Sequence, residues 1–127
     1  MGISGRKKIL VVDDDGFHLS VVEKMLEDEY EVSAAKSGEE ALERLRGKFV
    51  PDMVLLDVLM PNMDGWEVYR RIRAINSLQD VPVVFFTSVT EKIEITHAYD
   101  IGAADYIMKP FEKEELLKRL ETTLKKH

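Results

Sequence analysis

The sequence predicts a single α/β domain, a doubly wound parallel sheet of five strands with helices on both faces. Five short apolar runs alternate along the 127 residues with five segments whose apolar side chains recur at helical spacing. Strands joined by helical crossovers pair in parallel, and a parallel sheet is covered on both faces. The length suits one domain with one hydrophobic core.

Each expected strand is short and ends at polar residues or near a proline. The central run is almost wholly apolar, and Pro61 follows it closely, so this strand cannot continue far. Pro82 is acceptable because it stands near the beginning of its strand. The expected strands are Ile9–Val12, Glu31–Ala35, Met53–Val58, Val81–Phe86 and Ala104–Met108.

Capping signals mark several of the expected helices. Ser37 and Glu40 have the spacing of a capping box, and Asp64 is placed as an N-cap. Asp15 is expected to begin or cap the first helix, and Gly102 to end the fourth. The expected helices run from Gly16 to Asp28, Ser37 to about Arg46, Asp64 to about Ala74 or Ile75, Glu91 to Ile101 and Glu112 to Leu124.

Composition excludes several classes of function. With 24 acidic and 18 basic residues, the formal net charge is -6, which argues against a general nucleic-acid surface. The absence of cysteine excludes disulfides and thiolate chemistry. No apolar run approaches the roughly 20 residues of a membrane span, and the first residues lack the apolar core of a signal peptide. We therefore expect a cytoplasmic domain without direct contact to membrane or nucleic acid.

Four of the five strands deliver chemically matched groups to one edge of the sheet. Asp13 and Asp14 follow the first strand, Asp57 the third, Thr87 the fourth and Lys109 the fifth. The carboxyl ends of parallel strands lie along the same edge, where ligands bind. Clustered carboxylates repel one another unless a cation is present, and Mg²⁺ prefers a few carboxylates with waters and phosphate oxygens. A lysine and a hydroxyl suit a phosphoryl group, so the sequence predicts Mg²⁺-assisted phosphoryl transfer with one Asp as acceptor.

These residues belong to motifs that occur in a fixed order over most of the chain. They are Ile9–Asp14, Leu55–Pro61, Met63–Gly65, Phe86–Ser88 and Gly102–Phe111. On these motifs the chain resembles the receiver (response regulator, chemotaxis-regulator-like) domains of bacterial two-component signal transduction. The resemblance implies a flavodoxin-like (βα)5 fold with strand order 2-1-3-4-5. It covers residues 7–125, leaving 1–6 as a flexible N-terminus and 126–127 as a C-terminal tail.

The resemblance implies a role for each acidic residue. Asp57 is expected to be the phosphoacceptor. Asp14 and Asp57 are expected to ligate Mg²⁺, with Mn²⁺ as an alternative, together with the backbone carbonyl of Leu59. Asp13 is expected to act on the metal through water.

It also implies a switch. Lys109 is expected to contact the phosphoryl oxygens and to precede a cis peptide bond to Pro110. Thr87 is expected to move and donate to the phosphoryl group, while Tyr106 changes between outward and inward positions. These two residues would relay the new charge to the surface of the fourth helix, fifth strand and fifth helix.

The implied partners are a sensor histidine kinase or phosphotransfer protein as donor, and a downstream protein or an output domain outside this sequence as target. A homodimer of the phosphorylated form is compatible with the resemblance. The domain is expected to be a switch rather than an enzyme, although it takes part in its own phosphotransfer and slow autodephosphorylation. Apolar Leu59 and Val89 flank the acceptor, which favours slow hydrolysis. His18 and His97 are expected to face solvent.

Three other classes fit less well. A metal-dependent phosphohydrolase would need a further acid or base after Asp57, where Val58 and Leu59 stand. A flavodoxin-like electron carrier would need a Ser-, Thr- and Gly-rich phosphate loop in place of three aspartates. A degenerate receiver that acts only as an interaction module would lack an active-site group, and none is missing.

Overall fold

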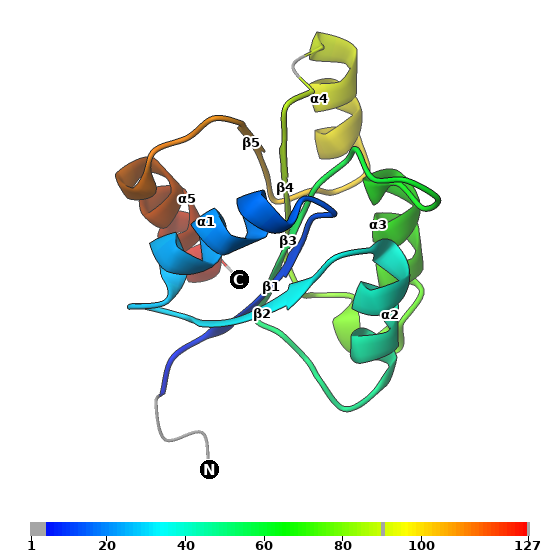
Figure 1. Ribbon diagram of the computed structural model, residues 1–127. Helices are drawn as coiled ribbons and strands as arrows, with labels where there is room; N and C mark the ends of the chain where they lie inside the picture. The colour runs from blue at the N-terminus through cyan, green and yellow to red at the C-terminus, as the bar shows by residue number, and fades with distance from the viewer. Residues whose placement is uncertain (1–4, 90, 127) are drawn as a thin grey trace.

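The computed structural model describes residues 5–89 and 91–126, in which strands and helices alternate as expected (Figure 1). In chain order the elements are β1 (Lys8–Val12), α1 (Gly16–Leu26), β2 (Glu31–Ala35), α2 (Gly38–Arg46), β3 (Met53–Leu56), α3 (Gly65–Arg73), the 3₁₀ helix η1 (Asn76–Leu78), β4 (Val83–Thr87), α4 (Lys92–Asp100), β5 (Asp105–Met108) and α5 (Lys113–Lys126).

The five strands form one sheet in the order β2-β1-β3-β4-β5, and every neighbouring pair is parallel. The expected flavodoxin-like order is thereby confirmed. The register pairs Val12 with Leu56 and Phe85 with Tyr106, so the strands end at a common edge. The residues that follow β1 and β3 therefore emerge side by side.

Helices cover both faces of the sheet (Figure 1). On one face, α1 and α5 pack on a core that includes Leu19, Leu116 and the strand residue Phe86. On the other face, α2, α3 and α4 pack on a core that includes Leu42, Ile72 and Phe85. Because β1, β3 and β4 lie inside the sheet, their side chains are buried on both faces apart from Lys8 at the start of β1, as continuous apolar runs indicate.

The capping residues act as predicted. Asp15 accepts hydrogen bonds from the backbone N–H groups of Phe17 and His18, and Ser37 and Asp64 accept from Glu40 and Glu67. Gly102 has a φ of +101° after α4, a conformation that favours glycine.

Some boundaries differ from the prediction. α1 ends at Leu26 rather than Asp28, because the N–H of Tyr30 turns back to the Leu26 carbonyl. β4 begins at Val83 rather than Val81, since the N–H of Val81 is taken by Leu78 at the end of η1, which the sequence did not reveal. Domain limits at 7 and 125 stay predictions, because residues 1–4 and 127 lie outside the described part of the chain. No helix within that part is long and apolar enough to span a bilayer.

Candidate functional site

The three aspartates meet where β1 and β3 end. Asp13 is fully buried and Asp57 nearly so, whereas Asp14 is exposed to solvent. Each offers one carboxylate oxygen, and these oxygens lie within 4.8 Å of one another. Two buried carboxylates and one exposed carboxylate at this spacing can bind a hard divalent cation, which would keep some of its water ligands on the exposed side. The residues present therefore fit Mg²⁺.

Lys109, which follows β5, supplies the positive charge at this cluster. Its Nζ lies 2.7 Å from Asp13 Oδ2 and 3.3 Å from Asp57 Oδ2. The same ammonium lies 4.7 Å from the centre of the Phe86 ring, within range of a cation–π contact. The Lys109–Pro110 peptide bond is cis, which confirms that prediction. A mostly buried lysine held between two carboxylates can turn to the oxygens of a phosphoryl group at Asp57.

The environment makes ionisation of Asp57 unfavourable. Burial raises the pKa of Asp57, and the charge of Asp13 raises it further, although Lys109 and the N–H of Leu59 oppose both effects. The Leu59 N–H donates to Asp57 Oδ1 at 3.2 Å. A single lysine thus leaves the aspartates short of positive charge, and a bound cation would relieve this.

Thr87 and Tyr106 both contact the backbone of Val89. Thr87 is the last residue of β4 and fully buried, and its Oγ1 accepts from the N–H of Val89 at 3.3 Å. Tyr106 is buried in the inward position and donates its hydroxyl to the Val89 carbonyl at 2.8 Å. Burial, followed by the charges of Glu94, Asp57 and Glu91, raises the pKa of Tyr106 to about 12, so the phenol remains a donor at neutral pH.

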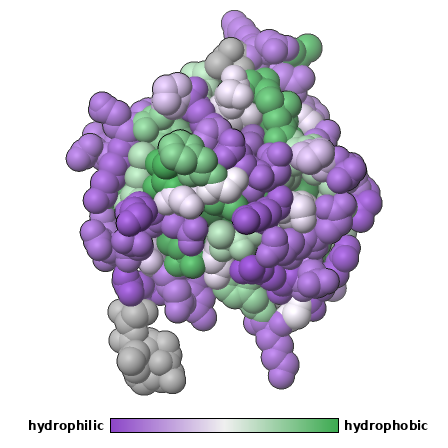
Figure 2. Space-filling model, viewed as in Figure 1, coloured by the Kyte–Doolittle hydropathy of each residue, from purple (hydrophilic) through white to green (hydrophobic). Residues whose placement is uncertain are grey.

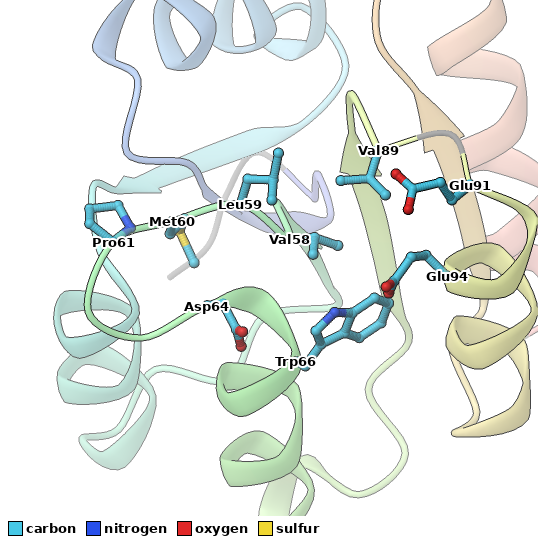
Figure 3. A pocket seen from close by; sticks show the side chains of 9 residues that line it. All are labelled: Val58, Leu59, Met60, Pro61, Asp64, Trp66, Val89, Glu91 and Glu94. Carbon is cyan, nitrogen blue, oxygen red and sulfur yellow. The ribbon is translucent and has the colours of Figure 1, made fainter.

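Leu59 and Val89 stand at one side of the site. Both line a cavity of about 620 Å³ between the loop after β3 and the start of α4 (Figure 3). Leu59 is 55% exposed, so an apolar group faces the water next to Asp57. At these two positions the chain therefore offers hydrocarbon instead of a polar side chain that would orient attacking water.

His18 was expected to face solvent, and the structure bears this out only in part, because one ring nitrogen turns toward the site. Nδ1 lies 3.3 Å from Lys109 Nζ and 3.6 Å from Asp13 Oδ2, with 45% of the side chain exposed. The sequence could have indicated this contact, because His18 stands in the first turn of α1, directly after the aspartates. His97 is exposed as expected, although its ring contacts Trp66.

The fold and this set of side chains define a class: a flavodoxin-like domain with an acidic, lysine-containing site at the carboxyl edge of its sheet. The family model described as response regulator receiver domain matches residues 9–121. The chain belongs to this family and is a receiver domain of the two-component response regulators.

Curated relatives extend beyond this domain. The chain is 38% identical over 122 residues to the probable transcriptional regulator ycf27 of Porphyra purpurea, covering 95% of the chain and 49% of the relative. It is 37% identical over 123 residues to the DNA-binding response regulator MtrA of Mycobacterium tuberculosis, covering 96% and 52%. The chain thus spans about half the length of the curated relatives it matches.

Solved structures of single domains match over nearly their whole length. The chemotaxis protein CheY4 of Vibrio cholerae is 32% identical with a TM-score of 0.85, covering 94% of this chain and 99% of that one. A CheY-like receiver domain protein of Methanospirillum hungatei is 28% identical with a TM-score of 0.87, covering 96% of both chains. These similarities agree with the strand order and the two helical layers described above.

Proposed function

We propose that Asp57 accepts a phosphoryl group from the phosphohistidine of a sensor histidine kinase or phosphotransfer protein. The observation that carries this proposal is the contact of Lys109 with both Asp13 and Asp57 inside a group of three carboxylates. Lysine next to an acceptor carboxylate neutralises charge on the incoming phosphoryl oxygens.

The transfer uses groups that the chain already places together. An oxygen of the Asp57 carboxylate attacks phosphorus and forms a P–O bond, while the P–N bond to the donor imidazole breaks and the imidazole takes up a proton. The Lys109 ammonium donates hydrogen bonds to the phosphoryl oxygens during the transfer. Asp13 keeps this ammonium near the site through its short contact with Nζ. The burial of Asp57 favours this reaction because a desolvated carboxylate is a stronger nucleophile.

Asp14 and Asp57 would hold Mg²⁺ directly, with the backbone carbonyl of Leu59, and Asp13 would act through water. Mn²⁺ would fit the same oxygen ligands. The metal ion supplies positive charge against the carboxylates and the phosphoryl oxygens.

Thr87 and Tyr106 would convert this local charge into a change of surface. When the Thr87 hydroxyl turns to the phosphoryl group, the Val89 N–H loses its acceptor, and the loop before α4 moves with it. The α4-β5-α5 surface carries exposed Ile93, Tyr99 and Met108, which suit a protein partner. That partner is a downstream protein, an output domain outside residues 7–125, or a second phosphorylated copy. We propose no direct nucleic-acid contact for this domain.

The phosphoryl donor would dock on the opposite side of the site. Hydrophobic side chains gather near α1 on the face shown in Figure 2, where Phe17, Val21, Met25 and Phe111 line a cavity that reaches Lys109. Such a docking surface would lie next to the acceptor, and we propose a cytoplasmic protein as the donor. The domain is a switch rather than an enzyme, and its own hydrolysis is slow because Leu59 and Val89 are apolar.

Intact-mass spectrometry after incubation with acetyl phosphate and Mg²⁺ tests the proposal. Wild type should gain one phosphoryl mass, and the gain should need Mg²⁺. Asp57→Asn should abolish it, whereas Asp28→Asn, an exposed aspartate in the turn after α1, should leave it unchanged. An equal gain in Asp57→Asn would mean that another residue is the acceptor.

A further inference from the structure

The cavity beside Leu59 and Val89 has three kinds of wall: hydrocarbon, carboxylates and an aromatic ring. We call it the Trp66 groove and define it by the nine residues labelled in Figure 3. Hydrocarbon from Leu59, Met60 and Val89 lines one part, and the carboxylates of Glu91, the residue before α4, and Glu94, in its first turn, line another. Its volume of about 620 Å³ exceeds what an ion needs and suits an extended side chain.

The acidic groups of the groove are not neutralised. Within the described residues, neither Glu91 nor Glu94 has an ion pair or a side-chain hydrogen bond, and the Asp64 carboxylate only caps α3. Other glutamates do find partners: Glu67 pairs with Arg70 and Arg71. The groove therefore keeps a negative potential that a positive ligand would satisfy.

Trp66 gives the groove a fixed aromatic wall. Its indole is held by Phe85, at 4.7 Å between ring centres, and by His97 at 4.9 Å. The hydroxyl of Tyr69 donates to the Ile101 carbonyl at 2.7 Å and ties α3 to the end of α4. The helices that carry Trp66 and Glu94 are thus joined in the free domain, so these two walls are in place before a ligand binds.

We propose that the Trp66 groove is a docking site for an arginine side chain of a partner protein. The apolar walls would contact the aliphatic stem, the planar guanidinium would lie on the indole of Trp66, and Glu91 and Glu94 would accept its hydrogen bonds. Arginine matches all three kinds of wall, whereas a divalent cation would use only the carboxylates.

Occupancy of the groove would depend on the state of the switch. The Val89 wall is the residue whose carbonyl holds Tyr106 inward, and Glu91 and Glu94 are close enough to raise the pKa of that phenol. A guanidinium bound between these glutamates would favour the arrangement of the loop that forms the groove. Linkage makes this coupling reciprocal. The factor by which bound arginine shifts the equilibrium of the loop is also the factor by which a switch of the loop changes the affinity for arginine.

Trp66 is the only tryptophan of the chain, so its fluorescence reports on the groove directly. The probe is acetyl-Leu-Arg-Leu-amide, titrated into the unphosphorylated domain, with the citrulline peptide as an uncharged counterpart. We expect a saturable change with the arginine peptide and a much weaker one with citrulline. Glu91→Gln/Glu94→Gln should weaken binding roughly fivefold or more, because two charge contacts are lost.

The matched control is Glu39→Gln/Glu43→Gln, which removes the same charge from the exposed side of α2 and should leave the affinity unchanged. An equal response to both peptides, or equal affinity in the Glu91→Gln/Glu94→Gln protein, would overturn the proposal. No response in wild type would overturn it too. None of these outcomes depends on Asp57 being the phosphoacceptor, because the titration involves no phosphoryl group.

Discussion

Tyr106 donates its hydroxyl to the carbonyl oxygen of Val89, while Thr87 accepts from the N–H of the same residue. Both polar backbone groups of Val89 are therefore held by the two side chains expected to move. The Tyr106 contact spans from β5 to the loop before α4, and the Thr87 contact spans only two residues. A rotation of either side chain leaves one backbone group of Val89 without its partner, which couples the two positions.

Tyr106→Phe should lower the free energy of unfolding by about 1 kcal/mol, the usual contribution of one hydrogen bond. The ring still packs, so only the hydroxyl is lost. Urea denaturation measures the change. Tyr30→Phe is the control, because the Tyr30 hydroxyl has no hydrogen bond among the described residues and its loss should change little. Equal effects in both variants would show that the Val89 contact adds nothing.

Lys109→Met should destabilise the metal-free domain by about 3 kcal/mol, since Asp13 and Asp57 lose the cation between them. Methionine keeps much of the aliphatic length of lysine but lacks the ammonium that lies over the Phe86 ring. Added Mg²⁺ should restore much of the loss, because it neutralises the same carboxylates. Unfolding curves with and without Mg²⁺ measure this, with Lys113→Met on the exposed start of α5 as control. A Lys109→Met domain as stable as wild type without metal would contradict the ion-pair account.

Asp57→Asn should stabilise the metal-free domain at neutral pH by about 1 kcal/mol or more. The pKa of Asp57 is raised on folding, chiefly by burial, so the folded state holds its proton more tightly than the unfolded chain. Protonated Asp57 therefore favours folding. This contribution is fully present at a pH below the pKa of Asp57 in the unfolded chain, and it is lost as the pH rises through the pKa of Asp57 in the folded domain. The advantage of asparagine should therefore shrink as the pH falls through the ordinary carboxyl range. An advantage that is constant with pH would contradict the raised pKa.

Leu59→Asn should shorten the lifetime of the phosphorylated domain roughly tenfold, because an amide beside Asp57 can orient the attacking water. Loss of the phosphoryl mass with time measures the rate. Ile93→Asn is the control, since Ile93 is 76% exposed on α4 and lies outside the Trp66 groove. The idea that apolar flanking groups slow hydrolysis fails if Leu59→Asn and wild type lose the phosphoryl group at the same rate.

Local patterns in the sequence were sufficient for the five strands, the five α-helices and the caps named above, but not for η1. The apolar run before Asp57, the acid at Asp15 and the glycine at 102 each act through neighbours a few residues away, so their effect can be read from spacing. The parallel crossovers then place Asp13, Asp57 and Lys109 at one edge, because the ends of parallel strands meet there. Boundaries were less certain because η1 takes the Val81 N–H, a contact that periodicity does not show.

Contacts between side chains of distant elements needed the tertiary structure. The approach of His18 to Lys109 joins α1 to the residue after β5, and the distance follows from how α1 packs on the sheet. The Trp66 groove likewise depends on the spacing between α3 and α4. The sequence by itself determined the order of elements, the family and the residues at the sheet edge, since these depend on local periodicity and connectivity. Which atoms touch was decided only by packing, because a side chain's neighbours across a core are set by the whole fold.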